Sequence, residues 1–412
     1  MDDGFVIVGA GLAGGKAVEA LRAQGYEGQL TLLGRERHRP YERPPLSKAY
    51  LARSQPLEKA FVHPADWYAE HEVDLRTGVT VTGIDRTAHR LQLSDGSQLG
   101  YRKLLLATGA SPRTLPLAGL DAPNVHTLRT VEDSDTLAES FAGMGRLLVI
   151  GAGWIGLEVA AVARQAGVEV SIVEAAELPL LRVLGPELAT VFADLHREQG
   201  VDLRFGAQLT EIVTSGGRAT GLRLADGTVL EGDAVLLSVG VAPNVQLAAE
   251  AGLAVDNGVL VDAALVSSDP DILACGDVAN VYSPFYNKRI RVEHWATALK
   301  QPATAARSML GEDASYDELP YFYSDQYDLG MEYLGYVEPG GYDDVLFRGN
   351  REGREFIAFW LAGGRVIAGM NVNVWDVADP IKALLRSGQP VDKDRLVDPA
   401  VPLDSLVGGL PD

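Results

Sequence analysis

The chain has 412 residues, of which 47% are hydrophobic and 22% charged, and its formal net charge is −20. This length is enough for two or three domains, each with its own core. The negative charge argues against a nucleic-acid partner, because phosphate binding needs a basic surface. No apolar run approaches the roughly 20 residues that a membrane span needs. The first expected strand begins within five residues of the N-terminus, so no signal peptide is expected.

The sequence contains one cysteine, Cys275. A single cysteine excludes an internal disulfide and a Cys-x-x-Cys redox centre. It fits a reducing compartment, so we expect a cytoplasmic protein. No metal site is expected.

An apolar run at residues 5–8 leads into a G-x-G-x-x-G pattern made by Gly9, Gly11 and Gly14. An all-apolar strand is typical of a parallel sheet that is buried on both faces. The first glycine makes a tight turn, the second lets the backbone approach a pyrophosphate, and the third lets the next helix pack closely. That helix, expected over residues 12–24, offers free N–H groups to the pyrophosphate. The segment therefore predicts a dinucleotide site.

A second apolar run at residues 30–33 precedes Glu36, the acid available to bind an adenosine ribose. The loop at residues 39–48 is rich in proline, which fixes the backbone and blocks a regular helix. It carries Arg43 and Lys48 and is suited to holding cations against a cofactor. A Pro-rich surface turn is the alternative interpretation.

The insertion that follows predicts a helix at residues 64–70 and a hairpin of strands 90–93 and 99–101. An apolar strand beginning at Lys103 then closes the unit and ends in Ala-Thr-Gly at residues 107–109.

The same plan recurs about 140 residues later, which makes internal duplication the main organisational signal. Gly151, Gly153 and Gly156 repeat the glycine pattern after an apolar run. A helix at residues 157–166 and a strand at residues 169–173 are expected to follow. Two copies predict two bound dinucleotides, or one dinucleotide and one degenerate site.

The second unit also repeats the acid, the hairpin and the closing strand. Glu174 follows its second strand, a hairpin turn is expected at residues 225–228, and the closing strand at 234–240 ends in Gly240. A later strand meets Gly276 and Asp277 at an expected helix start, where an acid can accept hydrogen bonds from sugar or polyol hydroxyls.

The composition changes from about residue 319, and the remainder reads as a separate antiparallel domain. Its expected elements are strands at 333–337, 344–347, 356–361 and 365–371, a helix at 379–386, and a loose tail beyond Gln389.

Over its whole length the chain resembles the two-dinucleotide-binding flavoproteins, and within them the FAD-dependent NAD(P)H:ferredoxin reductases of bacterial P450 and ring-hydroxylating dioxygenase systems. The motifs that carry the resemblance are Gly9–Gly14, Arg43–Lys48, Leu106–Gly109, Leu128–Thr130, Gly151–Glu158, Gly240–Asn244, Cys275–Asp277, Val292–Trp295 and Ser324–Gln326. The resemblance implies an α/β fold with two Rossmann-like, glutathione-reductase-type domains and a C-terminal α+β domain. The implied divisions are an FAD domain at 1–113 and 241–318, an NAD domain at 114–240, and a C-terminal domain at 319–412.

The resemblance implies FAD in the first site. The matching positions are Gly9, Gly11, Ala13, Gly14, Glu36, Arg43, Lys48, Val81, Ala107, Thr108, Gly109, Arg129, Gly276, Asp277 and Trp295. Among these, Val81 matches an adenine contact. The family residues that match Arg129, Asp277 and Trp295 touch the pyrophosphate, ribityl chain and flavin ring.

The resemblance implies a nicotinamide cofactor in the second site, at positions Gly151, Gly153, Trp154, Ile155, Gly156, Glu158, Glu174 and Gly240. A carboxylate at Glu174 can bond both ribose hydroxyls and repels the extra phosphate of NADPH, which favours NADH. Arg182 lies farther on and complicates this choice, and a surface acid is the alternative for Glu174. The implied catalytic pair is Lys48, near the flavin, and Glu158, which reaches the nicotinamide end.

The absence of a cysteine pair decides the onward route of the electrons. Disulfide reductases of this superfamily need two cysteines beside the flavin, and the matching loop here holds Pro44–Ser47. Electrons are therefore expected to leave FAD one at a time for a [2Fe-2S] ferredoxin, as in a ferredoxin–NAD(+) reductase. A basic stretch with Lys288, Arg289, Arg291 and Lys300 is the candidate docking surface. A solvated face is the alternative for this stretch.

Other functions stay open at this point. Rubredoxin, a quinone, monodehydroascorbate or oxygen are competing acceptors, and a redox-regulated flavoprotein of the apoptosis-inducing-factor type is a competing class. The chain also departs from the family pattern. Arg35 stands where an acid is usual, which puts FAD affinity in doubt. Tyr321 and Tyr323 replace tryptophans, either at the ferredoxin face or in the core at a domain seam.

Overall fold

The computed structural model describes residues 4–408. Contacts divide the chain into two compact units, each described by itself. Unit 1 comprises Met1–Pro44, Pro56–Ser111 and Val241–Glu318, and unit 2 comprises Pro45–Gln55, Pro112–Gly240 and Leu319–Asp412. The short segment Pro45–Gln55 thus packs with unit 2, although its sequence neighbours belong to unit 1. The finer three-domain division of the sequence stays a prediction.

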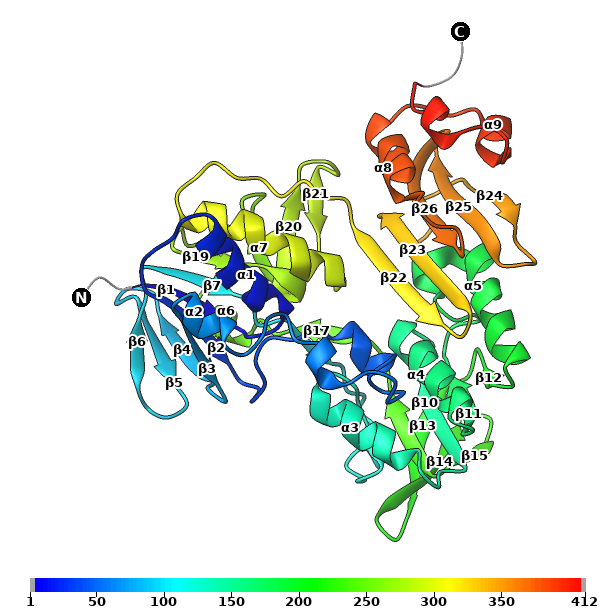
Figure 1. Cartoon of the computed structure of the whole chain (residues 1–412). Coiled ribbons are helices and arrows are strands. Elements are labelled where there is room, and N and C mark those ends of the chain that lie inside the picture. Colours follow the sequence, from blue (N-terminus) through cyan, green and yellow to red (C-terminus); the bar gives the residue numbers. More distant parts are fainter. Residues whose placement is uncertain (1–3, 409–412) are drawn as a thin grey trace. The chain divides into compact units, whose positions relative to one another are not determined.

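Unit 1 is built on a five-stranded parallel sheet in the order β19-β7-β1-β2-β3. The strands are β1 (Phe5–Val8), β2 (Leu30–Gly34), β3 (Val73–Thr77), β7 (Lys103–Leu106) and β19 (Ile272–Ala274). Residues of β1, β2 and β19 are buried throughout, as expected for a sheet covered on both faces. Helices α1 (Leu12–Ala23) and α7 (Trp295–Met309) lie side by side (Figure 1).

Smaller elements complete unit 1. They are α2 (Trp67–Glu70), β4 (Val81–Asp85), β5 (Arg90–Leu93), β6 (Gln98–Gly100), β8 (Ala110–Pro112), β17 (Val241–Pro243), α6 (Gln246–Glu250), β18 (Val259–Val261), β20 (Ala279–Ser283), β21 (Lys288–Ile290) and short 3₁₀ turns at Leu57–Lys59 and Gly276–Val278. The predicted hairpin is confirmed as β5–β6.

Two predictions in unit 1 were wrong in detail. The helix expected at residues 64–70 is a single turn, α2, whose Trp67 ring is stacked between His63 and His71 at centroid distances of 3.9 and 4.1 Å. The helix expected at Gly276 is only a 3₁₀ turn, because the chain enters β20 directly after it.

Unit 2 contains a second five-stranded parallel sheet, in the order β12-β11-β10-β16-β9. The strands are β9 (Val125–His126), β10 (Arg146–Ile150), β11 (Glu169–Val173), β12 (Asp202–Arg204) and β16 (Ala234–Leu237). Helices α3 (Val131–Ser140), α4 (Trp154–Gln165) and α5 (Leu181–Glu198) accompany it. A three-stranded antiparallel sheet is formed by β13 (Leu209–Ser215), β14 (Arg218–Leu224) and β15 (Val229–Glu231).

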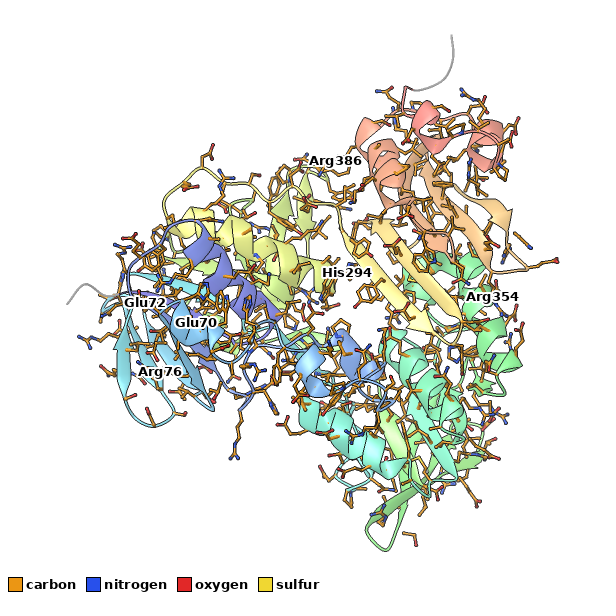
Figure 2. All side chains as sticks on the ribbon, in the orientation of Figure 1. Glu70, Glu72, Arg76, His294, Arg354 and Arg386 are labelled. Carbon is orange, nitrogen blue, oxygen red and sulfur yellow. The ribbon has the colours of Figure 1, made fainter. Side chains whose placement is uncertain are left out.

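The C-terminal part of unit 2 is a five-stranded antiparallel sheet in the order β22-β23-β26-β25-β24. Its elements are β22 (Tyr321–Gln326), β23 (Leu329–Gly335), β24 (Asp344–Asn350), β25 (Glu355–Ala362), β26 (Arg365–Val372), α8 (Ala378–Ser387), α9 (Lys393–Val397) and a 3₁₀ turn at Leu403–Leu406. Another 3₁₀ turn, at Pro44–Ser47, lies where the chain passes from unit 1 into the segment Pro45–Gln55. This sheet packs on α5, where Arg354 pairs with Glu198 (Figure 2).

The loose tail expected beyond Gln389 was also wrong. The segment forms α9 and a 3₁₀ turn, and Arg348 of β24 holds it by donating to the carbonyl oxygens of Asp398 and Val401, both at 2.7 Å. Lys393 also pairs with Asp344. Within residues 4–408, no helix is both long enough and apolar enough to cross a membrane.

Candidate cofactor-binding and redox site

The predicted FAD residues of unit 1 gather at the carboxyl edge of its parallel sheet. Val8 is paired with Leu106, and Leu106 with Ala274, so β1, β7 and β19 end at the same level. The segments that leave these ends are Gly9–Gly14, Ala107–Gly109 and Cys275–Asp277. In open α/β sheets ligands bind at this edge, at the point where the strand order reverses.

The first glycine cradle shows why each glycine is needed. A Cβ on Gly9 would lie 2.1 Å from the carbonyl oxygen of Ala107, and one on Gly14 would lie 1.9 Å from that of Gly9. These two glycines are required by the packing of the protein itself. A Cβ on Gly11, in contrast, would meet nothing within 4 Å. The open space at Gly11 is where the backbone can approach a pyrophosphate.

The second cradle repeats this pattern. A Cβ on Gly151 would lie 2.3 Å from the Ser238 oxygen, one on Gly156 would lie 2.4 Å from the Gly151 oxygen, and one on Gly153 would meet nothing. Neither α1 nor α4 has a side-chain N-cap or an acidic residue in its first turn. Both helices therefore present their first N–H groups and positive dipole ends to an anion. The residues present fit two dinucleotides.

Glu36 lies after β2 and is held by two neighbours. Arg43 Nη2 lies 2.6 Å from Glu36 Oε1, and the Tyr41 hydroxyl donates to Oε2. Burial alone raises the pKa of Glu36, but Arg43 and Tyr41 together bring the pKa below its ordinary value. Glu36 is thus an acid with a lowered pKa and with Arg43 fixed beside it, and its role toward the ribose stays a prediction.

The turn at Ala107–Gly109 is braced by Asn244. The Thr108 hydroxyl donates to the Asn244 carbonyl oxygen at 3.0 Å, and the Asn244 amide donates back to the Thr108 oxygen at 2.7 Å. Asn244 therefore fixes the loop against which Gly9 packs.

The Gly276–Asp277 turn lies against α1. A Cβ on Gly276 would lie 3.1 Å from the Cβ of Ala13, and Gly276 N–H donates to Gln301 at 2.8 Å. Arg291 donates to the Asp277 carbonyl oxygen at 3.2 Å. Ala13 and Gly276, two of the predicted FAD positions, are thus brought together, with Asp277 next along the turn.

Three further predicted FAD positions lie on other elements. Val81 begins β4 and packs against the core of unit 1, and Trp295 begins α7. Arg129 precedes α3 in unit 2, where its N–H donates to Asp133 at 2.9 Å. Their roles toward FAD stay predictions.

The NAD positions occupy the carboxyl edge of the second sheet, where Ile150, Val173 and Leu237 end neighbouring strands. Glu174 follows β11 and accepts the N–H groups of Ala152 and Ala176, each at 2.8 Å. This carboxylate therefore also braces the glycine-rich turn.

The neighbouring NAD positions differ in their packing. Gly240 adopts φ +91° and its oxygen accepts the N–H of Arg113. Trp154 packs edge-on to Phe192 and contacts Phe322 at a centroid distance of 4.7 Å, while Ile155 is half-buried.

The predicted catalytic pair is present within unit 2. Lys48 Nζ lies 2.7 Å from Glu158 Oε1, and the side chains are 17% and 5% exposed. Lys48 Nζ also lies 5.6 Å from the Tyr323 ring centroid. A buried carboxylate is normally paired with a cation or with hydrogen-bond donors, and Lys48 is such a partner.

Two serines that the sequence did not single out complete the environment of Glu158. The Ser47 hydroxyl donates to Glu158 Oε2 at 2.5 Å, and the Ser324 hydroxyl donates to Oε1 at 2.7 Å. Ser324 lies in the Ser-Asp-Gln motif at residues 324–326, and this motif was the only hint in the sequence that Ser324 belongs to the site. The Glu158 carboxylate thus has partners from the Pro45–Gln55 segment and from β22.

The lysine segment is anchored to α3. The Ser134 hydroxyl donates to the Leu46 carbonyl oxygen at 2.9 Å, and Asp135 accepts from Tyr50 at 2.9 Å and from Arg53 at 2.6 Å. These bonds hold Lys48 where it meets Glu158.

The tyrosines that replace tryptophan are engaged inside the C-terminal sheet. The Tyr321 hydroxyl donates to Glu332 at 2.7 Å, and Tyr323 faces Lys48. Both side chains are half-buried.

Cys275 is fully buried at the end of β19, and burial raises the pKa of its thiol to about 12. A thiol in this state is not a nucleophile at neutral pH. Cys275 therefore packs as a small side chain.

The basic stretch is less available than its composition suggested. The Arg291 side chain is 6% exposed and pairs with Glu293 at 2.7 Å, and Arg289 donates to the backbone oxygens of Val261 and Asn280. Lys300 pairs with Glu318 at 2.7 Å.

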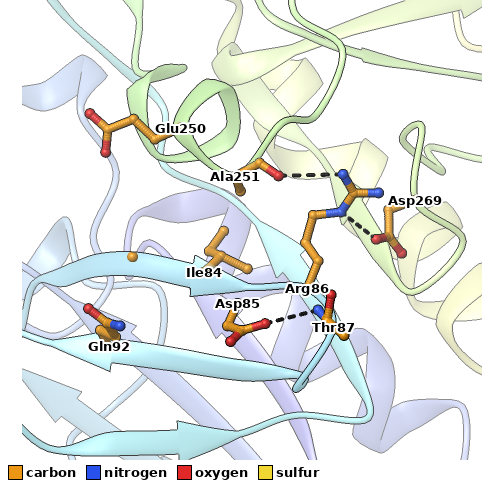
Figure 3. Close-up of a pocket in the computed structure, with 9 residues that line it drawn as sticks. Ile84, Asp85, Arg86, Thr87, Gln92, Glu250, Ala251 and Asp269 are labelled. Carbon is orange, nitrogen blue, oxygen red and sulfur yellow. Dashed lines mark hydrogen bonds and ion pairs between the residues drawn. The ribbon is translucent and has the colours of Figure 1, made fainter.

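One pocket in unit 1 lies between β4 and α6 (Figure 3). Its cation, Arg86, is bonded to Asp269 at 2.7 Å and to the Ala251 and Gly252 oxygens. These groups satisfy one another and point to no ligand. Among the described residues, no cluster of metal-ligating side chains is found.

Two family models match the chain. Pyridine nucleotide-disulphide oxidoreductase matches residues 4–302, and Reductase C-terminal matches residues 321–407. The chain belongs to the pyridine nucleotide-disulphide oxidoreductase family. Its fold is the α/β arrangement of two nucleotide-binding domains and a C-terminal α+β domain that the sequence predicted.

Two curated relatives match almost end to end. Putidaredoxin reductase CamA of Pseudomonas putida is 39% identical over 98% of this chain and 97% of its own length. The ferredoxin–NAD(+) reductase component of an anthranilate 1,2-dioxygenase system from Burkholderia cepacia is 40% identical over 98% of this chain and 99% of its own length.

Two solved structures agree. The ferredoxin reductase for the CYP199A2 system from Rhodopseudomonas palustris matches with a TM-score of 0.94 and 36% identity, over 98% of this chain and 99% of that one. The reductase in the covalent putidaredoxin reductase–putidaredoxin complex matches with a TM-score of 0.94 and 38% identity, over 98% of each chain. Membership of this family implies FAD and NADH as cofactors.

Proposed function

We propose that the chain is an NADH-dependent flavoprotein that passes electrons from FAD, one at a time, to a [2Fe-2S] ferredoxin of a cytochrome P450 or ring-hydroxylating oxygenase system. The observation that carries the proposal is the Lys48–Glu158 pair. Lys48 directly follows the loop Pro44–Ser47, where a disulfide reductase would need two cysteines. The two glycine cradles provide for both dinucleotides. The named relatives are ferredoxin reductases of such systems.

The residues of the chain have distinct tasks in this proposal. Bound FAD supplies the chemistry, accepting two electrons from NADH and releasing them singly. Gly11 and the N-terminus of α1 receive the FAD pyrophosphate, and Glu36 receives its ribose. Gly153 and α4 receive NADH, and Glu174 its ribose hydroxyls. Lys48 supplies a positive charge at the flavin, and Glu158 fixes that charge and the nicotinamide carboxamide.

The docking surface is a further part of the proposal. The β20–β21 hairpin exposes Tyr282 and Phe285, with exposed fractions of 37% and 38%, next to Lys288 and Arg289. Exposed aromatic rings beside cations suit an acidic protein partner. Lys300, on α7, is a further cation of the proposed surface, and it pairs with Glu318. Arg291 is not part of this docking surface, because its guanidinium is buried. Its role is to support the Asp277 turn by donating to the Asp277 carbonyl oxygen.

The test is anaerobic reduction followed by electron transfer. The purified protein loaded with FAD is expected to bleach with NADH and then to reduce cytochrome c only when a [2Fe-2S] ferredoxin is added. Parallel assays with rubredoxin, a quinone, monodehydroascorbate and oxygen test the competing acceptors. Rapid NADH oxidation by oxygen with no response to any ferredoxin would replace the proposal with an oxidase.

A further inference from the structure

Strand β22 carries two buried polar side chains on one face. Ser324 and Gln326 are 0% and 1% exposed, and they are two residues apart, so they face the same side of the strand. Buried polar groups are expected to have hydrogen-bond partners. Both side chains find partners in the nucleotide-binding part of unit 2.

The partners form a chain of hydrogen bonds that ends at Glu158. His196 Nε2 lies 2.9 Å from Gln326 Oε1, and Gln326 Nε2 donates to Ser324 Oγ at 3.2 Å. Ser324 Oγ donates to Glu158 Oε1 at 2.7 Å. A hydroxyl has one proton, and here it is committed to the carboxylate. Every donor in the chain therefore points toward Glu158.

This direction fixes the state of His196. Since Gln326 Oε1 can only accept, the imidazole carries its proton on Nε2. The ring is fully buried on α5, and burial lowers its pKa to about 4 although the bond to Gln326 favours the charged form. His196 is thus a neutral donor at physiological pH.

The turn after β22 supports the same geometry. Tyr327 adopts a left-handed conformation with φ +56°, and its ring packs against the His196 ring at 5.3 Å. A bulky residue rarely adopts this conformation. The turn thus places the Tyr327 ring edge-on to the His196 ring.

We propose that Ser324, Gln326 and His196 are positioning residues that align the Glu158 carboxylate, and through it the Lys48 ammonium, for the reductive step. The inference rests on the function proposed above. Ser324 and Lys48 share one carboxylate oxygen, Oε1, while Ser47 holds the other. With Ser324 removed, Oε1 keeps only the lysine, so the carboxylate loses one of its three polar contacts and is held less tightly.

A competing anion lies next to Ser324. The pKa of Asp325 lies above its ordinary value, chiefly because the carboxyl group is partly buried. The nearby Glu158 carboxylate also raises this pKa, and the Lys48 ammonium lowers it. Lys48 thus experiences two carboxyl groups, and a loosened Glu158 lets Asp325 compete for the ammonium. A small displacement of the catalytic charge is enough to slow a reaction step markedly.

The decisive variants are Ser324→Ala, which removes the hydroxyl, and Ser324→Thr, which restores it. Gln326→Leu breaks the chain one bond farther away. Ser171→Ala is the matched control, because Ser171 is also buried and donates to a carboxylate, Asp202, at 3.2 Å. Its hydroxyl takes no part in the hydrogen bonds that link His196 to Glu158.

Three measurements are made on the FAD-loaded protein. Imidazole ¹⁵N NMR reports the His196 tautomer, stopped flow with NADH reports the rate constant of flavin reduction, and NADH titration reports its dissociation constant. Ferredoxin is absent, so the result does not depend on the electron acceptor. Wild-type protein that reduces FAD with NADH but reduces no ferredoxin would refute the proposed function alone.

We expect Ser324→Ala to lower the rate constant about tenfold with little change in the NADH dissociation constant. Ser324→Thr restores the rate, and Ser171→Ala leaves it unchanged. Gln326→Leu lowers the rate and removes the single Nε2–H tautomer of His196. The inference is overturned by a wild-type rate in Ser324→Ala, by an equal loss in Ser171→Ala, or by failure of Ser324→Thr to restore the rate.

Discussion

Lys48 Nζ lies 2.7 Å from Glu158 Oε1, although the two residues are far apart in the sequence and the Glu158 side chain is only 5% exposed. Removing one partner leaves the other charge buried and unpaired. We therefore expect Lys48→Met and Glu158→Gln each to lower the free energy of unfolding by about 1–3 kcal/mol, with the double variant less destabilised than the sum. Urea unfolding measures this.

The same variants test the catalytic role of the pair. Each is expected to slow flavin reduction by NADH about tenfold or more in stopped flow, because the charge at the flavin is lost or misplaced. Arg146→Met is the control, since Arg146 forms an exposed pair with Glu169 at the amino end of β10 and takes no part in anchoring the lysine segment. A normal rate in Lys48→Met would remove Lys48 from the mechanism.

The two glycine cradles predict opposite effects for neighbouring glycines. Gly11→Ala is expected to weaken FAD binding about tenfold or more. The free energy of unfolding of the FAD-free variant is expected to stay within about 0.5 kcal/mol of the wild-type value. Gly9→Ala is expected to destabilise the FAD-free protein by at least about 2 kcal/mol, because of its φ of +117° and the Ala107 oxygen. Fluorescence titration and urea unfolding measure these effects.

Gly153→Ala provides the matched comparison, because it should weaken NADH binding and leave FAD binding intact. Equal effects of Gly11→Ala and Gly153→Ala on both cofactors would contradict the assignment of one dinucleotide to each cradle.

Glu174 is expected to set the preference for NADH. Glu174→Arg should raise kcat/KM for NADPH relative to NADH about tenfold or more, because a repulsive charge becomes an attractive one. Glu174 also braces Ala152 through Oε2 and Ala176 through Oε1, so Glu174→Gln removes the charge while it keeps one of the two bracing bonds. Glu177→Gln in the same loop is the control. An unchanged cofactor ratio in both Glu174 variants would show that another group discriminates.

The Glu36–Arg43 pair predicts a pH dependence of stability. The folded-state pKa of Glu36 lies below its ordinary value of 4.5. Its contribution is therefore complete above about pH 4.5 and is lost as the pH falls through the folded-state pKa. We expect Glu36→Gln to cost about 1 kcal/mol at pH 7, with the difference from wild type shrinking on acidification. Urea unfolding of the FAD-free protein at pH 7 and at lower pH measures it. A difference that grows on acidification would contradict the assignment.

The proposed docking surface predicts a change in the ferredoxin KM. Lys288→Glu and Lys300→Glu should raise the KM for a [2Fe-2S] ferredoxin several-fold and flatten its salt dependence, because attraction to an acidic partner is lost. Arg197→Glu, an equal charge change at an exposed position of α5, is the control. Arg291 is left intact, because its guanidinium supports the Asp277 turn. An unchanged KM would mean that the basic stretch is a solvated surface.

The nucleotide cradles were predictable from the sequence because their chemistry is local. The glycine spacing, the apolar strand before it and the helix after it all lie within about twenty residues, and the duplication confirmed the pattern. Because neighbouring parallel strands end at the same edge, Ala107 lies next to Gly9, and Gly276 lies next to Ala13.

The surroundings of Glu158 were not predictable in the same way. Ser47 and Ser324 reach it from segments that are distant in sequence, and no spacing rule relates them to α4. The structured tail was missed because Arg348 holds it by bonds to backbone oxygens, which leave no pattern in the tail itself. The burial of Arg291 was missed because a run of cations does not show which of them turns inward.

The assignment of Pro45–Gln55 to unit 2 has a consequence for engineering. A chimera that exchanges nucleotide-binding modules between related reductases at the obvious boundaries would take Glu158 from one parent and Lys48 from the other. The donor's lysine loop must therefore travel with its carboxylate helix and with the first strand of its C-terminal sheet. Hybrids assembled without that insert would bring together groups that did not evolve as partners.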